Sequence, residues 1–483
     1  MKSFSENDLL REACLIDGTW IEVGDDGIAV DDPATGEIVG RVPKLGAAET
    51  EAAIAAAERA MPAWAARTAK DRAQVLRAWF DLIMAHQDVL ARILTREQGK
   101  PLAEAKGEIA YAASFIEWFA EEAKRIYGEV VPGHMPDKRI VVLKQPIGVV
   151  AAITPWNFPA AMITRKLAPA LAAGCTTVLK PASQTPFTAL ALAVLAEEAG
   201  VPAGVINVVT GGAAAIGGAL TASPVVRKLT FTGSTEIGAK LYEQSAPTIK
   251  KLSLELGGNA PFIVFDDADL DAAVAGAIAS KYRNAGQTCV CANRLYVQAG
   301  IHDRFVEALA KAVNGLVVGN GLDQATTIGP LIDEAAVAKA QQHVDDAVAK
   351  GARIVTGGKA HPLGGRYFQP TIIEGVKAGM LVLNEETFGP VAPIIRFEDE
   401  SDAIAKANAT EFGLAAYFYA RDMGRAWRVA EALESGIVGI NTGLISTEVA
   451  PFGGVKVSGL GREGSRHGID DYLEIKYLCI GIA

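Results

Sequence analysis

CTTVLKP (175–181), TALALAVLAEEAG (188–200), VINVVTGG (205–212) and VRKLTFTGS (226–234) follow one another closely in the chain and decide its fold class. The first, third and fourth runs are short and rich in β-branched residues, which is typical of strands, whereas the second has the length and pattern of a helix. The fourth run leads directly into STEIGAKLYEQSA (234–246), a helical pattern that begins at a serine. Because short strands that alternate with helices form parallel sheets, this stretch predicts an α/β fold.

The sequence on both sides continues this alternation. Upstream, residues 50–60 and 71–99 carry an apolar stripe at helical spacing, and residues 140–155 have the pattern of strands. Downstream, a second α/β pattern starts at PFIVFDDADL (261–270), and the chain ends in an alternating strand at DYLEIKYLCIGIA (471–483). In the second pattern we expect helices near 268–286, 302–313 and 425–435, and strands near 353–358 and 392–397. No internal repeat or long linker interrupts the two patterns, so we expect closely packed domains.

Size and composition exclude several classes of protein. The chain has 483 residues, which suggests two or three domains, and 50% of them are hydrophobic. Its net charge of −10 argues against nucleic acid and anionic membranes as partners. Five widely spaced cysteines argue against a disulfide framework, and six scattered histidines argue against a metal site. The first residues lack the basic and apolar pattern of a secretion signal, so we expect a cytoplasmic protein.

Four segments carry residues that could perform chemistry. Cys289 in GQTC could act as a nucleophile, although a lone cysteine is more often a buried structural residue. Glu255 in ELGG could be a general base or a solvated strand end, and Asn157 in PWNFP could stabilise an oxyanion or complete a turn. Gly233 and Ser234 in FTGSTEIG open a helix where a phosphate can bind, although their spacing differs from that of the dinucleotide fingerprint.

The motifs PWNFP, VLKPASQTP, FTGSTEIG, LELGG, GQTCVCANR and EETFGP occur in the order and approximate spacing of the aldehyde dehydrogenase superfamily, which the whole chain resembles. The final stretch, GLIS followed by PFGGVKVSGLGREGSRHGIDDYLEIKYLCIG, is most similar to the succinate-semialdehyde dehydrogenase subgroup. The resemblance implies an aldehyde dehydrogenase-like α/β fold with a Rossmann-type cofactor domain, an α/β catalytic domain and a small β extension for oligomerisation. We expect these parts at 1–128 with 148–257, at 258–468, and at 129–147 with 469–483.

The resemblance also implies a covalent mechanism. The Cys289 thiolate would attack the aldehyde to form a thiohemiacetal, whose oxyanion would be stabilised by the Asn157 amide and the Cys289 backbone N–H. Loss of hydride to a nicotinamide would leave a thioester, which water activated by Glu255 would hydrolyse. Lys166 and Glu463 match a pair often assigned to proton relay, and a plain structural role is an equal alternative for them.

Cofactor contacts follow from the same resemblance. The matching residues are Trp156, Lys180, Gly233, Ser234, Leu256, Glu386 and Phe388, with Thr387 standing where many members have isoleucine. Many NAD-preferring relatives carry glutamate at the position of Ser183, and a carboxylate there repels a 2′-phosphate. Because Ser183 removes this repulsion and Lys180 supplies a cation, we expect NADP⁺ to be accepted and preferred over NAD⁺. The alternative is that Ser183 only caps a turn.

Arg165, Arg283 and Ser446 match the positions that hold the far carboxylate of the substrate in the subgroup. The planar guanidinium suits a carboxylate because it can donate two parallel hydrogen bonds; the alternative is two surface arginines. The implied reaction is oxidation of succinate semialdehyde to succinate. Glutarate semialdehyde or another acid-aldehyde stays open, because one methylene changes binding by only about 1–3 kcal/mol. A non-catalytic member that serves as a structural or binding protein is the alternative of another class.

Two further expectations concern Cys291 and assembly. Cys291 follows the nucleophile by two residues and is either a small buried side chain or a redox partner that forms a strained disulfide with Cys289. By the resemblance, the strands at 129–147 and from 469 onward pair between subunits, so we expect a homotetramer or homodimer.

Overall fold

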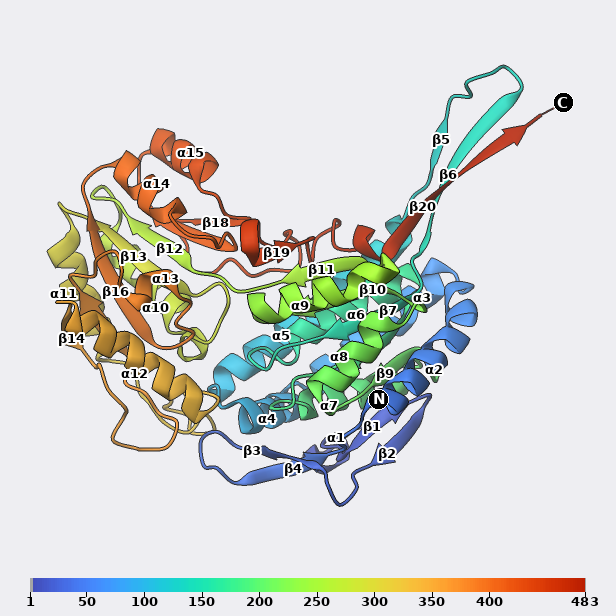
Figure 1. Ribbon diagram of the computed structural model, residues 1–483, viewed down its shortest axis with the longest axis horizontal. Coiled ribbons are helices and arrows are strands. Elements are labelled where there is room, and N and C mark those ends of the chain that lie inside the picture. Colours follow the sequence, from blue (N-terminus) through green and yellow to red (C-terminus); the bar gives the residue numbers. More distant parts are fainter. Residues whose placement is uncertain (1–2, 483) are drawn as a thin grey trace.

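The computed structural model describes residues 3–482, which form two large β-sheets with helices packed against them and two small sheets (Figure 1). Residues 1–2 and 483, at the outer ends of the predicted ranges 1–128 and 469–483, lie outside the described residues. The α/β fold class is confirmed. Short elements outside the two large layers are α1 (Glu6–Leu9), β3 (Ile28–Asp31), β4 (Ile38–Val42), and the 3-10 turns η1 (Ala123–Arg125), η2 (Ala246–Thr248), η3 (Arg283–Gly286), η4 (Lys456–Ser458) and η5 (Asp470–Tyr472).

The first large sheet has eight strands, of which the five central ones run parallel. In spatial order they are β19 (Gly459–Leu460), β11 (Lys251–Glu255), β10 (Val226–Thr232), β7 (Val149–Ile153), β8 (Thr176–Lys180), β9 (Ile206–Val208), β1 (Ala13–Ile16) and β2 (Thr19–Glu22). Strand β8 is buried along its whole length, as expected for a parallel strand that helices cover on both faces.

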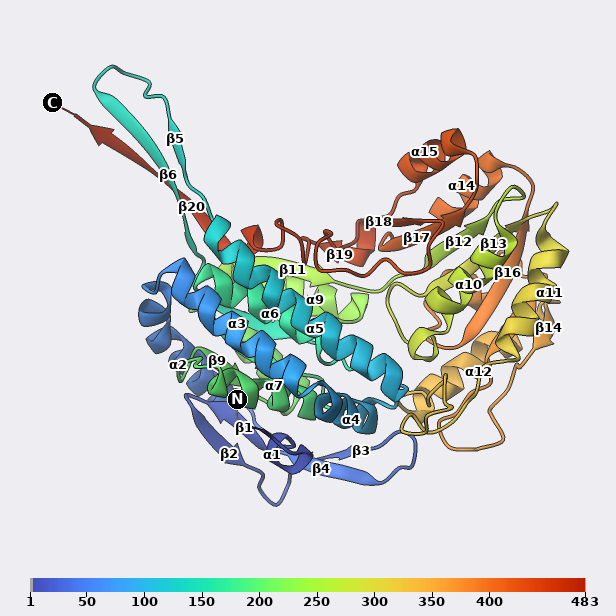
Figure 2. The same ribbon diagram turned by 180° about the vertical axis from the view of Figure 1, so that it is seen from behind.

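Helices cover both faces of this sheet (Figures 1 and 2). One layer contains α2 (Ala47–Ala65), α8 (Ala213–Ala222) and α9 (Thr235–Ser245). The opposite layer contains α3 (Ala69–Ala85), α4 (Gln87–Gln98), α5 (Leu102–Glu122), α6 (Ala161–Ala173) and α7 (Phe187–Glu198).

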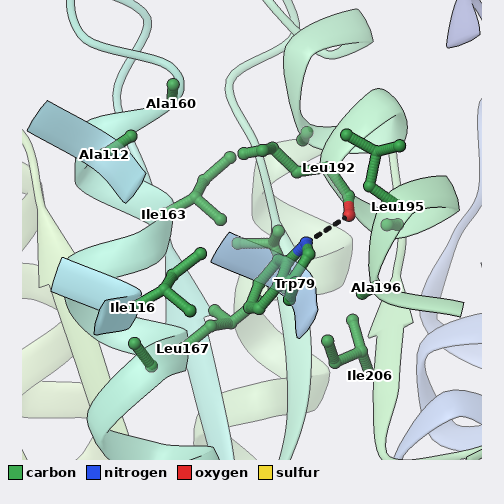
Figure 3. Close-up of a cluster of buried hydrophobic side chains, with 14 of the residues drawn as sticks. Trp79, Ala112, Ile116, Ala160, Ile163, Leu167, Leu192, Leu195, Ala196 and Ile206 are labelled. Atoms are coloured by element: carbon green, nitrogen blue, oxygen red, sulfur yellow. Dashed lines mark hydrogen bonds between the residues drawn. The ribbon is translucent and has the colours of Figure 1, made fainter. Parts of the chain in front are cut away.

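The helices of the opposite layer enclose a continuous apolar core (Figure 3). Trp79 from α3 packs among Ile116 of α5, Ile163 of α6 and Leu192 of α7. Its indole N–H donates a hydrogen bond of 3.0 Å to the Leu192 carbonyl oxygen, so this buried tryptophan leaves no polar group unsatisfied. The core holds α5 and α6, which carry several residues of the candidate site, in fixed positions.

The second large sheet has seven strands, parallel except for the pair β14 and β15. In spatial order they are β14 (Arg353–Thr356), β15 (Thr371–Glu374), β16 (Val391–Phe397), β13 (Ala292–Gln298), β12 (Ala260–Val264), β17 (Ala415–Tyr419) and β18 (Ile437–Ile440). Its helices are α10 (Leu270–Lys281), α11 (His302–Val313), α12 (Glu334–Ala349), α13 (Leu381–Asn384), α14 (Glu400–Asn408) and α15 (Met423–Ala432).

One short strand from the predicted catalytic range joins the first sheet. Strand β19 runs antiparallel to β11, with Gly459 opposite Glu255 and Leu460 opposite Leu254. A Cβ on Gly459 would lie 1.8 Å from the Leu254 carbonyl oxygen, so the backbones can approach only at glycine. This pairing brings the segment after 459 beside Glu255, whereas the domain boundaries themselves stay predictions.

The third sheet projects away from the rest of the protein and carries the C-terminal strand (Figures 1 and 2). It contains β5 (Glu129–Val131), β6 (Lys138–Pro146) and β20 (Leu473–Gly481), with β6 antiparallel to both others. Large apolar side chains on it are exposed, including Val130 at 80% and Ile475 at 71%. Such exposure is typical of a surface that another subunit covers.

Two kinds of feature are absent from residues 3–482. None of the helices there is long and apolar enough to cross a membrane. Within the same residues, no group of three or more His, Cys, Asp or Glu side chains is arranged to hold a metal ion.

Candidate active site

Cys289 follows a left-handed turn and precedes β13. The helix predicted near 268–286 ends at Lys281, because Asn284, Ala285 and Gly286 have φ angles of 50°, 54° and 77°. Left-handed backbone is unfavourable for residues other than glycine, so this turn must be held by its surroundings. At Gly286 an added Cβ would lie 2.2 Å from the Gly389 carbonyl oxygen, which excludes any side chain.

Side-chain amides hold this turn and bring Asn157 to it. The Asn157 Nδ2 donates to the Gln287 carbonyl oxygen over 3.0 Å, and the Asn284 Nδ2 donates to the Asn157 carbonyl oxygen over 3.0 Å. The Gln287 Oε1 in turn accepts from the Ile332 N–H over 2.9 Å. Asn157, which is 3% exposed, therefore lies against the segment that carries Cys289, where an amide donor could reach an oxyanion.

A buried ion pair also holds the backbone of Asn157. The Lys100 Nζ lies 2.5 Å from the Glu108 Oε2 and donates to the Asn157 carbonyl oxygen over 2.7 Å. The other Glu108 oxygen accepts from the backbone N–H groups of Ala160 and Ala161, at 2.9 and 3.3 Å, at the start of α6. A carboxylate is favourable at a helix N-terminus, so one pair fixes both the loop and the helix.

Glu255 is the last residue of β11 and is 3% exposed. Neither of its carboxylate oxygens has a hydrogen-bond partner among residues 3–482. Burial, and after it the negative charge of Glu463, raises the pKa of Glu255 well above its ordinary value. A buried carboxylate that binds a proton readily has the property of a general base near neutral pH.

Glu463 lies between two buried cations of α6. Its Oε2 is 2.6 Å from the Arg165 Nε, and its Oε1 contacts the Lys166 Nζ, which also donates to the Thr232 Oγ1 over 2.5 Å. Burial opposes the charge of Glu463, but Lys166 and Arg165 hold its pKa below the ordinary value. The predicted pair Lys166 and Glu463 is therefore in contact, and Arg165 joins it.

A cavity of about 280 Å³ opens on one side of Cys289. Among the predicted residues it is lined by Cys289, Asn157, Trp156, Gly233, Ser234, Leu256, Glu386 and Phe388. The cavity is also lined by Pro155, Thr232, Gly257 and Lys339, which were not predicted as site residues. The first three lie within the motifs PWNFP, FTGSTEIG and LELGG, whereas Lys339 lies on α12, which the sequence pattern did not reveal.

The floor of this cavity fits a nucleotide cofactor. Ser234 caps α9 by accepting from the Ile237 N–H over 3.4 Å, and helix N-termini attract phosphate. A Cβ on Gly233 would lie 2.4 Å from the Phe231 ring, and a Cβ on Gly238 would lie 2.4 Å from Leu256. Both glycines therefore permit the tight strand-to-helix turn that aims the helix N-terminus at the cavity.

The segment with Glu386 and Phe388 is held from both sides. Phe388 has a φ of 54° and its ring lies 5.6 Å from the Trp156 ring, edge to face. The Lys339 Nζ donates to the Glu386 carbonyl oxygen over 2.6 Å, and the Glu386 Oε1 accepts from the Gly258 N–H over 3.2 Å. Burial raises the pKa of Glu386 to about 7.

Thr387, the departure from the usual isoleucine, has a hydrogen-bonding partner. Its Oγ1 lies 3.1 Å from the Nδ1 of buried His343, whose Nε2 lies 3.3 Å from the Glu385 Oε2. His343 thus connects the residues on both sides of Glu386.

Lys180 and Ser183 lie away from this cavity, at and after the carboxyl end of β8. The Lys180 Nζ donates to the Pro181 carbonyl oxygen over 3.3 Å, and no carboxylate of residues 3–482 lies within ion-pair distance of it. Burial lowers the pKa of this lysine. A buried ammonium without an anion is suited to bind one.

A second, small cavity lies on the other face of the Cys289 segment. Thr288 and Val290 line it together with the predicted Arg283 and Ser446. The Arg283 guanidinium stacks over the Phe158 ring at 5.0 Å and has no carboxylate of the described residues within ion-pair distance. Arg165 does not line this cavity; it is fully buried over the Phe452 ring at 4.0 Å.

Cys289 and Cys291 are both free thiols in different surroundings. Burial, followed by the charge of Glu386, raises the pKa of Cys289 to about 12, whereas Arg165 lowers it. Cys291 is 1% exposed, and its Sγ accepts from the Lys281 Nζ over 3.4 Å. A disulfide between the two stays a prediction.

Comparisons with known proteins identify the family of the chain. Residues 20–478 match the aldehyde dehydrogenase family. The chain is 70% identical over 479 residues to the succinate-semialdehyde dehydrogenase (NADP⁺) of Escherichia coli, with 99% of each chain covered. It is 68% identical over 475 residues to the glutarate-semialdehyde dehydrogenase of Pseudomonas aeruginosa, with 98% of each covered. A crystal structure described as an E. coli NADP-dependent enzyme superposes with a TM-score of 0.98 at 70% identity, with 99% of each chain covered.

The charges around Glu255 generate a prediction about pH. A carboxylate accepts a proton only when ionised, so turnover that needs Glu255 as a base falls on the acid side of its raised pKa. The substitution Glu463→Gln removes the negative charge that raises the pKa of Glu255. Arg165 and Lys166, which lower that pKa, remain, so the pKa of Glu255 should fall. We expect the acid limb of the pH profile of kcat to move to lower pH by roughly one unit.

The control is Glu474→Gln, the same chemical change at an exposed position on β20, which should leave the profile in place. An acid limb that stays still or moves to higher pH in Glu463→Gln would contradict the assignment, provided that the melting temperature shows a folded variant.

Proposed function

Because the chain belongs to the aldehyde dehydrogenase family, we propose that it oxidises succinate semialdehyde to succinate with NADP⁺ as hydride acceptor. The resemblance noted from the sequence motifs is thereby confirmed at the level of the family. The observation that carries the substrate is Arg283, a guanidinium beside the Cys289 segment without an ion-pair partner among residues 3–482. A cation in such a place supports an anionic group on the substrate.

The first step is attack of the Cys289 sulfur on the aldehyde carbon. The pKa of about 12 means that the thiol is protonated in this state, so its proton must leave as the bond forms. Glu255 is the adjacent carboxylate and can take that proton, because its own pKa is raised. The oxygen that becomes negative would accept hydrogen bonds from the Asn157 amide and the Cys289 N–H, each of which is typically worth about 3 kcal/mol of barrier.

The cofactor, when bound, accepts the hydride that converts the thiohemiacetal into a thioester. The cofactor would be held by the predicted residues that line the cavity beside Cys289: Ser234, Gly233, Trp156, Leu256, Glu386 and Phe388. Glu255 must first release the Cys289 proton to solvent. It can then remove a proton from the water that attacks the thioester carbon and return it to the departing sulfur, so succinate leaves as the Cys289 thiol is restored. Lys166, Glu463 and Arg165 support this step by setting the pKa of Glu255.

Preference for NADP⁺ is supported by Lys180 and Ser183. A 2′-phosphate would find a buried cation without a carboxylate partner in Lys180 and no competing negative charge at Ser183. The Escherichia coli relative that is 70% identical is named for NADP⁺.

Glutarate semialdehyde is the second candidate substrate. A relative that is 68% identical is named for it, and one extra methylene changes binding by only about 1–3 kcal/mol. The non-catalytic alternative is disfavoured because Cys289 and Asn157 line one cavity and Glu255 is close enough to Cys289 to influence its pKa.

We also propose that the protein assembles into an oligomer and lies in the cytoplasm. The exposed apolar residues of β5 and β20 support pairing of these strands between subunits in a homodimer or homotetramer. Free thiols at all five cysteines fit a reducing compartment, and we propose the cytoplasm.

The catalytic assignment predicts distinct effects at two residues. Cys289→Ala should abolish turnover and leave cofactor binding near normal, because it removes the nucleophile and little volume. Glu255→Gln should lower the steady-state rate by about 10²–10⁴-fold. A burst of one reduced nicotinamide per subunit would place the slowed step at thioester hydrolysis, whereas a slow rate without a burst would place it at attack by Cys289, the other step that uses Glu255.

Absorbance at 340 nm in a stopped-flow instrument measures both effects, with Cys479→Ala on exposed β20 as the matched control. Full steady-state turnover by Cys289→Ala would refute the mechanism.

The substrate assignment predicts selective losses. Arg283→Ala should reduce kcat/KM for succinate semialdehyde far more than for an uncharged aldehyde of similar length. Arg165→Ala also removes the partner of Glu463, so it should reduce both values, and the value for the acid-aldehyde more. The loss of a cation from a desolvated carboxylate commonly costs about 2–5 kcal/mol. Exposed Arg353→Ala on β14 serves as the control. Equal losses on the charged and neutral aldehydes would mean that these arginines do not bind a carboxylate.

The cofactor assignment predicts a switch at one residue. Ser183→Glu should lower kcat/KM for NADP⁺ and spare NAD⁺, because the new carboxylate repels the 2′-phosphate. The ratio of the two kcat/KM values, in wild type and in the variant, measures the effect, and the neighbouring Gln184→Glu tests for a general effect of charge. A wild type that strongly prefers NAD⁺, or a ratio unchanged by Ser183→Glu, would contradict the assignment.

A further inference from the structure

We propose that Tyr111 is a further specificity-determining residue, whose phenolic hydroxyl donates a hydrogen bond to the distal acid group of the substrate. The proposal rests on the proposed function, because it assumes that an acid-aldehyde occupies the side of Cys289 that Arg283 and Ser446 line. Tyr111 belongs to none of the sequence motifs described above.

Ring contacts connect Tyr111 to Arg165. Tyr111 lies in the middle of α5, and its ring contacts the Phe115 ring edge to face at 4.9 Å. The other neighbour of Phe115 is the Arg165 guanidinium, 5.5 Å above the ring. Helices α5 and α6 pack side by side (Figure 2), and the Phe115 ring links Tyr111 of α5 to Arg165 of α6.

The Tyr111 hydroxyl is buried and has no well-formed hydrogen bond among residues 3–482. Buried hydroxyl groups in folded proteins are almost always satisfied, so one that is not marks a place where a ligand or water completes the structure. The backbone around it needs nothing from this group, since the Tyr111 carbonyl oxygen already accepts from the Ser114 Oγ over 2.8 Å.

The groups that surround this hydroxyl are those expected to hold the substrate. Burial raises the pKa of Tyr111, and Arg165, Arg283 and Ser446 are close enough to lower it in part. The phenol therefore stays protonated at neutral pH and acts as a donor. Three donor residues from three other segments of the chain are thus close enough to interact with the Tyr111 hydroxyl.

The surplus of donors indicates an anion as their shared partner. Arg165 Nη2 is buried without a hydrogen bond, and Arg283 has no ion pair among the described residues. A carboxylate offers about four lone-pair sites, so it can accept from both guanidinium groups and still accept from a hydroxyl. A neutral aldehyde lacks these acceptors, so the Tyr111 hydroxyl should matter only for substrates with an acid group.

The experiment compares Tyr111→Phe with wild type on succinate semialdehyde and on an uncharged aldehyde of similar length. We expect kcat/KM for the acid-aldehyde to fall roughly 10- to 100-fold, the usual effect of a lost hydrogen bond to a charged group. The value for the uncharged aldehyde should stay within about twofold. The inhibition constant of succinate should rise by a similar factor, which reports binding without turnover.

Tyr367→Phe is the matched control, because Tyr367 is buried, donates to the Ala34 carbonyl oxygen over 3.3 Å and is remote from the site. Equal losses on both aldehydes, or no loss on either, would overturn the role of Tyr111. If Arg283→Ala also lacks selectivity for the acid-aldehyde, the proposed substrate class fails with it. If Arg283→Ala is selective and Tyr111→Phe is not, only the inference about Tyr111 fails.

Discussion

Glu463 lies between Arg165 and Lys166 in a part of the protein that water does not reach. Taking one of these charges out of water alone would cost several kcal/mol, so the three must be buried together or not at all. This requirement binds the segment after β19 to α6, although almost the whole catalytic half of the chain separates them in sequence. It also places a negative charge close to Glu255, whose raised pKa depends on that neighbour after burial itself. The charge cluster therefore contributes both to the joining of the two halves and to the basicity of the residue at their junction.

The start of α6 is held by a second buried pair in a similar way. Glu108 accepts from the first N–H groups of the helix, and Lys100 neutralises it and donates to the Asn157 carbonyl oxygen. A break in this pair would leave a buried charge and free the start of α6 together with the loop that carries Asn157. The left-handed turn before Cys289 depends on the same loop, because Asn284 donates to Asn157 and Asn157 donates to Gln287. The hydrogen bonds that hold this strained turn therefore depend on residues in and beside the helices of the first sheet.

Local patterns were enough to predict the elements that repeat a simple period. The parallel strands β7, β8 and β10 and the amphipathic α11 were predicted because their hydrophobic spacing is clear. The short strands β1–β4 and the alanine-rich α12 were not predicted. Because α12 was missed, its residues Lys339 and His343, which hold the loop of Glu386, were missed as well. Helix α6 is buried on all sides, so its Arg165 and Lys166 had no polar face from which their environment could be inferred. The motifs located Cys289, Asn157 and Glu255, but contacts across the helices, such as those of Tyr111, leave no periodic signal in a single sequence.

The two arginines on the substrate side differ in how firmly they are held. Arg165 is packed over Phe452 and faced by Glu463, so its guanidinium has little freedom to move. Arg283 is held mainly by stacking on Phe158 and has no carboxylate of the described residues within ion-pair distance, so its long side chain can change rotamer at small cost. In the proposed mode of binding, the sulfur of Cys289 holds the aldehyde end of the substrate, Arg165 stays fixed by Glu463, and Arg283 follows the acid group. Such a site would select strongly for the negative charge and weakly for the length of the connecting chain. A rotamer change of Arg283 accommodates a methylene, whereas a missing charge leaves the Arg283 guanidinium unpaired.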